Sequence, residues 1–294
     1  MQSHIFFRLR GPNIIGSAFF AFTGLLINLR QHNPFEWTGA IFIILSMIFF
    51  NIFIWVVNDY FDAPYDAEHS IKGARNVFCE GTNSRNYKIG FTVMVFSLIA
   101  GLISGGLAGP FYFLFAAAGM VLAYLYSSPV FRAKSRLFFD WFFHVVWFQI
   151  TFLPLYLYIF GFNVIWGLEI QHIQFYAIFV FISMFSLLGQ INHQIPDYSV
   201  DLQTQQRTTV VVLGIETTKK IRYLAYLLIV AATIVLCLLN STILALIMMV
   251  IYTLYALKTN TKMAEDSPLA WLYFFLADYL VITPFLSFVI VFFF

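Results

Sequence analysis

The chain has 294 residues, of which 61% are hydrophobic and only 10% are charged. Soluble globular domains carry about 25% charged residues, so this composition excludes an ordinary water-soluble domain and predicts a polytopic membrane protein. The formal net charge of +2 gives no indication of nucleic-acid binding, because membrane topology accounts for the basic residues.

Nine apolar runs along the chain are long enough to cross a bilayer, which takes roughly 20 residues. The expected spans are residues 12–29, 37–57, 88–107, 110–127, 141–162, 172–195, 221–239, 241–257 and 268–293. The first run lacks a clear small-residue cleavage site and eight more follow it, so we interpret it as a retained helix rather than a secretory signal. Cys79 is expected in a loop and Cys237 inside a span, so we expect no disulfide.

The spans define the expected fold, which is a single all-α domain over residues 1–294 with nine transmembrane helices around a central cavity. The sixth span holds the place in the second half of the chain that the second span holds in the first half. A pseudo-repeat of helices 1–4 and 5–8, with helix 9 appended, follows from that equivalence.

The Lys and Arg residues predict the orientation of these spans. With nine spans, fifteen of the sixteen lie on one side of the membrane, and only Arg30 lies on the other. Positive residues concentrate in cytoplasmic loops, so we expect a cytoplasmic N-terminus and an outside C-terminus at Phe294. The long connections after the second and sixth spans are then cytoplasmic, and we expect them to cap that face.

An acidic cluster ends the second span, where Asn58, Asp62 and Asp66 are spaced four residues apart. Positions i, i+4 and i+8 share one face of an α-helix, so these side chains are expected to form a polar stripe. Asp59 adds negative charge beside it. Pro64 removes a backbone donor and is expected to kink or end the helix, which would place Asp66 on a separate turn.

A second cluster, Asp197 and Asp201, has the same spacing at the end of the sixth span, next to Pro196. One such pair is most often a solvated helix boundary, but two pairs at equivalent places in both halves favour a functional site. Carboxylates gathered this closely either raise one another's pKa or need a cation, and hard oxygen ligands suit Mg²⁺ shared with substrate phosphate. The expected metal ligands are Asn58, Asp62, Asp66, Asp197 and Asp201.

Basic side chains on the same face would complete a diphosphate site, because they neutralise leaving-group charge while a metal bridges the phosphate oxygens. The candidates are Lys72, Arg75, Arg132 and Lys134. Membrane topology alone also predicts cations here. The histidines lack metal-ligand spacing, so His193 is expected to be a hydrogen-bonding neighbour of Asp197 and His144 an interior residue.

These motifs resemble those of the UbiA superfamily of intramembrane prenyltransferases. Residues 58–66 (NDYFDAPYD) are similar to its first motif, N-x-x-x-D-x-x-x-D, and residues 197–201 (DYSVD) to its second, D-x-x-x-D. Residues 126–129 (YSSP), with the basic run after them, resemble the family's connection after helix 4. Residues 207–214 resemble its R-T…L-G stretch after the second motif. The resemblance covers essentially the whole chain.

The resemblance implies Mg²⁺-dependent transfer of a prenyl group from a prenyl diphosphate to a lipophilic acceptor within the membrane. Departure of the diphosphate leaves an allylic cation, which the acceptor attacks and which aromatic ring faces can stabilise. The implied catalytic residues are Asp62, Asp66, Asp197, Asp201, Tyr124 and Tyr126. The implied diphosphate-binding residues are Asn58, Lys72, Arg75, Arg132 and Lys134.

One stretch departs from the pattern of some subfamilies. Where R-P-[IL]-x-x-G often follows the first motif, residues 75–81 of this chain are RNVFCEG, so the acceptor is left open among quinone, isoprenoid and ether-lipid precursors. No surplus basic cluster suggests a second anionic substrate. We therefore expect a largely apolar acceptor, such as an aromatic quinone precursor or an isoprenoid hydrocarbon, over a glycerophosphate ether lipid.

A cation-coupled transporter is the alternative from another functional class. Transporters place ionisable groups near the bilayer midplane on broken helices, whereas nearly all acidic residues of this chain lie at the ends of spans. The exception is Asp278, inside the ninth span, to which we assign no role.

Overall fold

The computed structural model describes residues 5–10, 14, 19–22, 25, 28, 34–68, 70–167, 169–203 and 206–240. The predicted eighth and ninth spans, with Asp278, lie outside these residues, as do Arg30 and the side chain of Cys237. Cys79 is a free thiol.

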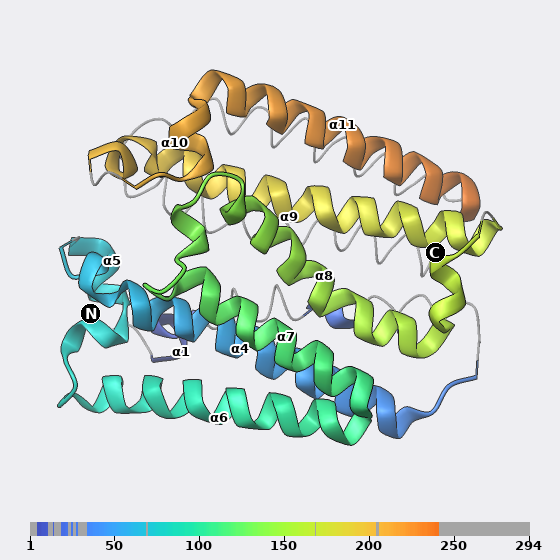
Figure 1. Ribbon diagram of the computed structural model, residues 1–294, viewed down its shortest axis with the longest axis horizontal. Coiled ribbons are helices and arrows are strands. Elements are labelled where there is room, and N and C mark those ends of the chain that lie inside the picture. Colours follow the sequence, from blue (N-terminus) through green and yellow to red (C-terminus); the bar gives the residue numbers. More distant parts are fainter. Residues whose placement is uncertain are drawn as a thin grey trace. The chain divides into compact units, whose positions relative to one another are not determined.

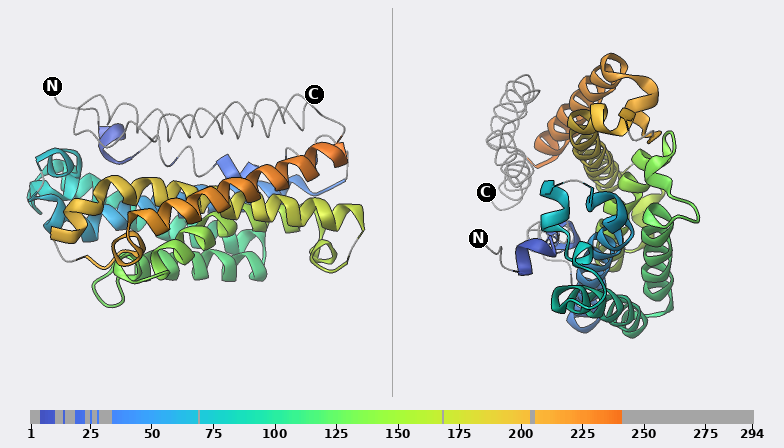
Figure 2. Two further views of the ribbon diagram at one scale, coloured as in Figure 1. Left: turned by 90° about the horizontal axis from the view of Figure 1, so that it is seen from above. Right: turned by 90° about the vertical axis from the view of Figure 1, so that its left-hand side faces the viewer.

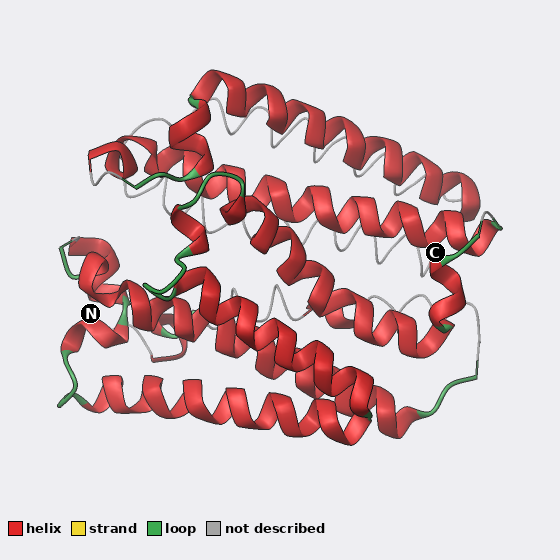
Figure 3. Cartoon of the chain, viewed as in Figure 1, coloured by secondary structure: helices red, strands yellow, loops and turns green. Residues whose placement is uncertain are grey.

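Every element in the described part of the chain is a helix (Figure 3). Five helices are long and apolar enough to cross a membrane, and they correspond to the predicted second to sixth spans. They are α4 (Trp37–Asp66), α6 (Arg85–Ala108), α7 (Pro110–Ser127), α8 (Phe139–Phe160) and α9 (Ile170–Gln203). The predicted seventh span lies within α11 (Ile215–Asn240). The all-α class is therefore confirmed for these residues, while the count of nine, the cavity and the cap stay predictions.

Short helices occupy the N-terminus and the connections. They are α1 (Ile5–Arg8), η1 (Phe19–Phe22), α5 (Ser70–Arg75), η2 (Val77–Glu80), η3 (Ala133–Ser135), η4 (Phe162–Ile165) and α10 (Thr209–Leu213).

The chain divides into two compact units. The first unit takes its residues from 1–25, 33–134 and 150–159, and the second from 26–32, 135–149 and 160 onwards. The expected single domain with its internal pseudo-repeat stays a prediction.

Helices α4, α6 and α7 pack against one another in pairs to form the body of the first unit (Figure 1). The right-hand view of Figure 2 shows the same helices from their ends. Gly109 alone separates α6 from α7 and has a φ of 136°, a conformation that glycine adopts without steric cost. Pro110 then begins α7, where its missing N–H costs nothing. The chain therefore runs up, down and up, so that α4 and α7 finish at the same end of the unit.

The helix α4 continues through Pro64 and ends at Asp66, so the expected break at the proline is wrong. Proline removes one ladder bond, but its fixed φ of about −65° fits a helix. The N–H of Ala67 donates to the carbonyl of Ala63 at 3.0 Å, so the ladder resumes beyond the proline. In the second unit α9 likewise includes Pro196. Both acidic motifs therefore lie on the last turns of long helices.

In the second unit α9 packs along α11 (Figure 1). The first half of α8, residues 139–149, runs antiparallel to α9 and is joined to it by polar pairs. One pair places His144 Nδ1 2.9 Å from Ser186 Oγ, which confirms the expectation of a hydrogen-bonded interior histidine. The buried apolar residues that join α8, α9 and α10 are Trp141, Ile191 and Val210.

Small residues let the helices of the first unit approach closely, as is common where lipid removes the hydrophobic drive for helix association. A Cβ added to Gly105 would lie 3.0 Å from the backbone oxygen of Tyr112. A Cβ added to the next residue, Gly106, would have its nearest neighbour, Phe113 Cδ2, at 3.7 Å. Only the first glycine is required by packing.

This difference predicts that Gly105→Leu destabilises the protein and Gly106→Leu does not. Forcing a side chain into a filled contact costs about 1–3 kcal/mol, and here the obstacle is backbone. Thermal unfolding of the detergent-purified protein measures the effect, with Gly106→Leu as the matched control. Equal melting temperatures for the two variants would contradict the helix packing described here.

Candidate active site

The first acidic motif lies on the last three turns of α4. Asn58 Nδ2 donates to Asp62 Oδ2 at 3.1 Å, so these two side chains lie on one helix face as the spacing predicted. Asp66 follows one turn later, at the end of α4. The motif is therefore a continuous polar stripe at the end of an apolar helix.

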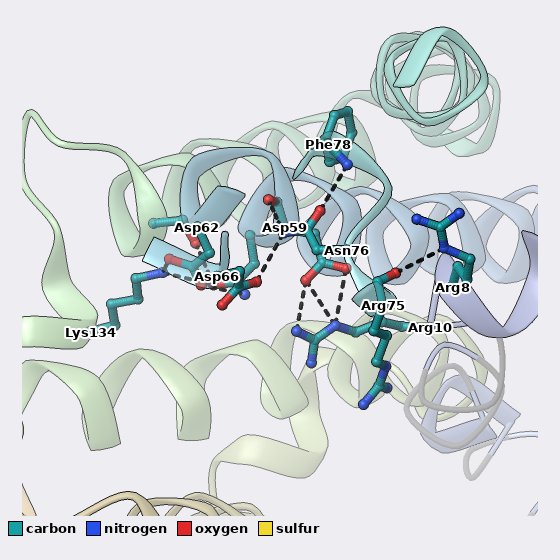
Figure 4. Close-up of polar contacts among 11 residues, drawn as sticks. Arg8, Arg10, Asp59, Asp62, Asp66, Arg75, Asn76, Phe78 and Lys134 are labelled. Carbon is teal, nitrogen blue, oxygen red and sulfur yellow. Dashed lines mark hydrogen bonds and ion pairs between the residues drawn. The ribbon is translucent and has the colours of Figure 1, made fainter. Parts of the chain in front are cut away.

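The connection after α7 brings cations to this stripe, because α4 and α7 finish at the same end of the first unit. Ser127 is the last residue of α7. Its Oγ donates to Asn58 Oδ1 at 2.9 Å. Lys134 Nζ lies 3.2 Å from the same oxygen and forms an ion pair with Asp62 Oδ1 (Figure 4). Burial lowers the pKa of Lys134, and the nearby charge of Asp62 opposes that shift. Lys134 therefore lies at the first motif, and its role at a diphosphate stays a prediction.

Arg132 comes from the same connection. Its Nη2 lies 4.0 Å from Asp62 Oδ1, and its guanidinium lies over the ring of Tyr65 at 4.1 Å from the centroid. Arg132 has a φ of 47°, a left-handed conformation that is uncommon for residues other than glycine. The backbone turn there directs two basic side chains toward one carboxylate.

The other two predicted cations, Lys72 and Arg75, both lie on α5, which follows α4 directly. The carbonyl of Arg75 accepts a hydrogen bond from Arg8 Nε at 3.4 Å. In Figure 4 the Arg75 side chain runs away from Asp62 and Asp66. The structure therefore brings Arg132 and Lys134 to the motif and places Lys72 and Arg75 on the connection beyond it.

Asp59 does not add free negative charge to the motif as expected, because it is 4% exposed and paired with Arg10. Arg10 Nε lies 2.8 Å and 3.1 Å from the two carboxylate oxygens, and Nη2 lies 2.7 Å from Oδ1. Sequence reasoning counted Arg10 only toward membrane orientation. Nothing in the local pattern indicated a partner 49 residues away.

Asp66 has a neutral partner. Asn76 Nδ2 donates to Asp66 Oδ2 at 2.9 Å and to the backbone carbonyl of Asp59 at 2.7 Å. Asn76 Oδ1 accepts from the N–H of Phe78 at 3.0 Å, which caps η2. Asn76 had no predicted role from the sequence. A signal was present, because Asn76 stands where the R-P-[IL]-x-x-G pattern has proline.

The second motif lies near the end of α9 in the second unit, where Asp197 and Asp201 share a helix face. Thr208 Oγ1 donates to Asp201 Oδ2 at 3.3 Å, and the N–H of Gln206 donates to the carbonyl of Asp201 at 2.8 Å. The stretch after the motif thus folds back onto the last turn of α9.

Asp140, fully buried at the start of α8, holds this stretch in place. Its carboxylate accepts bonds from the N–H of Thr209 at 2.8 Å and from Gln194 Nε2 at 2.6 Å. It also accepts from the Thr209 hydroxyl and, at 2.8 Å, from the N–H of Trp141. Four donors satisfy the buried charge without a cation. Asp140 was not predicted from the sequence. The one signal for it was an acidic residue directly before the predicted span 141–162.

Tyr124 and Tyr126 lie two residues apart on α7, so their side chains point in directions about 200° apart around the helix axis. Tyr124 packs edge-on against Phe61 of the first motif, with ring centroids 5.5 Å apart. Tyr126 lies on the other flank of α7. The ring of Tyr124 therefore lies beside the residue that precedes Asp62.

The oxygens of the first motif fit a hard divalent cation. Asn58 Oδ1 and Asp62 Oδ1 both contact Lys134 Nζ, so oxygens from successive turns can converge on one positive centre. Within the described residues no three Asp, Glu, His or Cys side chains gather into a metal cage. Mg²⁺ does not require one, since it keeps several waters and uses one or two carboxylates together with substrate phosphate.

The comparisons with known proteins agree on one family. A family model described as the UbiA prenyltransferase family matches residues 17–291. No curated protein matches the sequence. Among solved structures the chain is similar to a UbiA homologue from Archaeoglobus fulgidus bound to GPP and Mg²⁺, with 18% identity and a TM-score of 0.65 over 97% of this chain and 99% of that one.

An apo UbiA homologue from Aeropyrum pernix K1 has 14% identity and a TM-score of 0.68 over 95% of this chain and 98% of its own. A structure from work on digeranylgeranylglyceryl phosphate synthase in membranes has 16% identity and a TM-score of 0.61, covering 98% of this chain and 97% of its own. At these identities the likeness to solved structures shows the fold.

The Arg10–Asp59 pair predicts a large stability effect. Arg10→Met leaves a buried carboxylate unpaired, which costs about 3 kcal/mol or more, and Arg10→Met/Asp59→Leu recovers most of that loss. Arg8→Met breaks the more exposed pair with Glu80 and is the matched control, with an expected cost of about 1 kcal/mol or less. Unfolding of the purified variants in detergent gives the comparison. A double variant no more stable than Arg10→Met would contradict the pairing.

Proposed function

The chain belongs to the UbiA prenyltransferase family, and from that premise we propose that it transfers a prenyl group from a prenyl diphosphate to a lipophilic acceptor in the membrane. The observation that carries the proposal is the meeting of Asn58 and Asp62 on α4 with Arg132 and Lys134 from the connection after α7. Oxygen ligands beside paired cations suit a metal-bound diphosphate.

We propose that Asn58, Asp62 and Asp66 would hold Mg²⁺, which would supply positive charge to the diphosphate leaving group. The A. fulgidus homologue of similar fold is bound to GPP and Mg²⁺, which supports this choice of metal and substrate. Asp197 and Asp201 of the second motif are proposed as metal ligands and catalytic residues from the family resemblance.

Lys134 has two tasks in this proposal. In the structure it neutralises Asp62, and it would pair with a diphosphate oxygen instead if Asp62 held the metal ion. Arg132 remains close to Asp62 and its charge favours the departing diphosphate. Lys72 and Arg75 on α5 are proposed to contact the diphosphate from the other connection.

The reaction breaks the carbon–oxygen bond of the allylic diphosphate, and the bonding electrons leave with the diphosphate oxygen. The allylic cation then forms a bond with the acceptor, and the cationic adduct loses a proton to give the neutral product. We propose that Tyr124, beside Phe61 of the first motif, stabilises that cation through its ring. Tyr126 keeps this role only as a proposal from the family resemblance.

The sidedness of the site follows from the distribution of Lys and Arg. We propose that the acidic helix ends face the cytoplasm, where the positive residues are concentrated, with the C-terminus outside. A transporter is not favoured, because Asp62 and Asp66 lie at the end of the α4 span rather than at its middle.

We propose a largely apolar acceptor, because both basic residues at the first motif are already engaged with Asp62. A phosphorylated acceptor would compete with the prenyl diphosphate for Arg132 and Lys134. A digeranylgeranylglyceryl phosphate synthase shares this fold, which makes the glycerophosphate class the necessary comparison.

The metal proposal predicts that chelation abolishes prenyl transfer and that Mg²⁺ restores it. Asp62→Asn and Asp197→Asn each lower the transfer rate by about 100-fold or more, since loss of even an outer-shell partner costs about 10–100-fold. Glu68→Gln is the matched control, because Glu68 is an exposed acid just beyond the motif. Rates with a labelled prenyl diphosphate in reconstituted vesicles decide the matter. Full activity of either aspartate variant would refute the assignment.

The acceptor proposal predicts a rank order. With a common geranylgeranyl diphosphate donor, an aromatic quinone precursor or an isoprenoid hydrocarbon is expected to be prenylated faster than a glycerophosphate ether-lipid precursor. Product formation for the three acceptor classes at equal concentration gives the comparison. A clear preference for the glycerophosphate would overturn the ranking and leave prenyl transfer in place.

A further inference from the structure

The three carboxylates at the end of α4 each have a different kind of partner. Asp59 is paired with Arg10, which is charged at any ordinary pH, and Asp62 is paired with Lys134. Asp66 accepts a hydrogen bond from the neutral amide of Asn76. Asp66 is therefore oriented by its partner without being neutralised by it.

The orientation of the Asn76 amide follows from its surroundings. Both partners of Nδ2, the carbonyl of Asp59 and the carboxylate of Asp66, can only accept, and the partner of Oδ1, the N–H of Phe78, can only donate. A flipped amide would lose all three bonds. Asn76 is 2% exposed, so water cannot readily replace any of them.

From this geometry, and resting on the proposed function, we infer that Asn76 is a positioning residue that holds Asp66 as the ready anionic ligand for the metal. Asn76 donates to Oδ2 of Asp66 and so fixes the direction in which both carboxylate oxygens present their remaining lone pairs to a cation. An outer partner of this kind fixes a ligand's orientation and thereby strengthens metal binding. Asp62, in contrast, must first release Lys134.

Asn76 also has a structural task, since its side chain caps η2 through the N–H of Phe78. The two tasks separate by substitution. Serine is as good a cap as asparagine but is too short to reach Asp66, so Asn76→Ser removes the positioning bond and keeps the cap. Asn76→Ala removes both.

The test measures Mg²⁺ binding apart from turnover. The melting temperature of the full chain in detergent is followed as Mg²⁺ is titrated in the presence of inorganic diphosphate. Asn76→Ser and Asn76→Ala are each expected to raise the half-maximal Mg²⁺ concentration by about 10-fold. Without Mg²⁺, Asn76→Ala lowers the melting temperature further than Asn76→Ser does, because it also loses the cap of η2. At saturating Mg²⁺ the rate of prenyl transfer by Asn76→Ser returns close to that of the wild type.

The control is Asn86→Ala. Asn86 also donates to a carboxylate of this unit, Glu80, at 3.0 Å, but it lies away from the motif, so its Mg²⁺ titration is expected to match the wild type. A wild-type titration for Asn76→Ser overturns the positioning role. If Asn76→Ser does not fold, Asn76→Thr replaces it, because threonine also caps a helix and is also too short to reach Asp66. The same rise in the half-maximal Mg²⁺ concentration is expected. A wild-type protein with neither Mg²⁺-dependent stabilisation nor prenyl transfer would instead refute the proposed function.

Discussion

A carboxylate at the edge of an apolar helix bundle must be given a cation or enough hydrogen-bond donors, because burial of an uncompensated charge is costly. Asp59, Asp62 and Asp66 impose that requirement three times within the last turns of α4. Their partners come from three other segments: Arg10 from the turn after α1, Asn76 from the residue before η2, and Lys134 from the connection after α7. The acidic residues of one helix thus hold all three segments at this end of the first unit.

The second unit meets the same requirement in another way. Asp140 is fully buried and accepts bonds from Trp141, Gln194 and Thr209, all of them neutral donors. Charge-assisted hydrogen bonds are roughly twice as strong as neutral ones, so this cluster fastens the start of α10 to both α8 and α9. Thr208, next in the chain to Thr209, is thereby held beside Asp201. A carboxylate outside the motif therefore fixes the surroundings of one inside it.

The helices were predictable because each rests on local information. The span 110–127 was predicted residue for residue as α7, since glycine and proline mark its start and Pro129 follows its end. α4 runs nine residues past the apolar span 37–57 and continues through Pro64, because a helix does not stop where hydropathy falls. Arg10, Asn76 and Asp140 escaped prediction for another reason. Their partners are brought near by tertiary packing, which neither periodicity nor spacing encodes.

The length of α4 has a consequence for where the chemistry takes place. Its 30 residues rise about 45 Å in total, whereas the hydrocarbon layer of a bilayer is about 30 Å thick. Trp37, a residue type that favours the lipid–water boundary, begins the helix and is exposed, so the surplus of about 15 Å emerges at the opposite end, with Asn58, Asp62 and Asp66. The bond broken in the proposed reaction then lies at headgroup depth, between two solvents. In the proposed reaction the diphosphate would depart into water and a lipophilic product would stay in the lipid, so that this partitioning would oppose the reverse reaction.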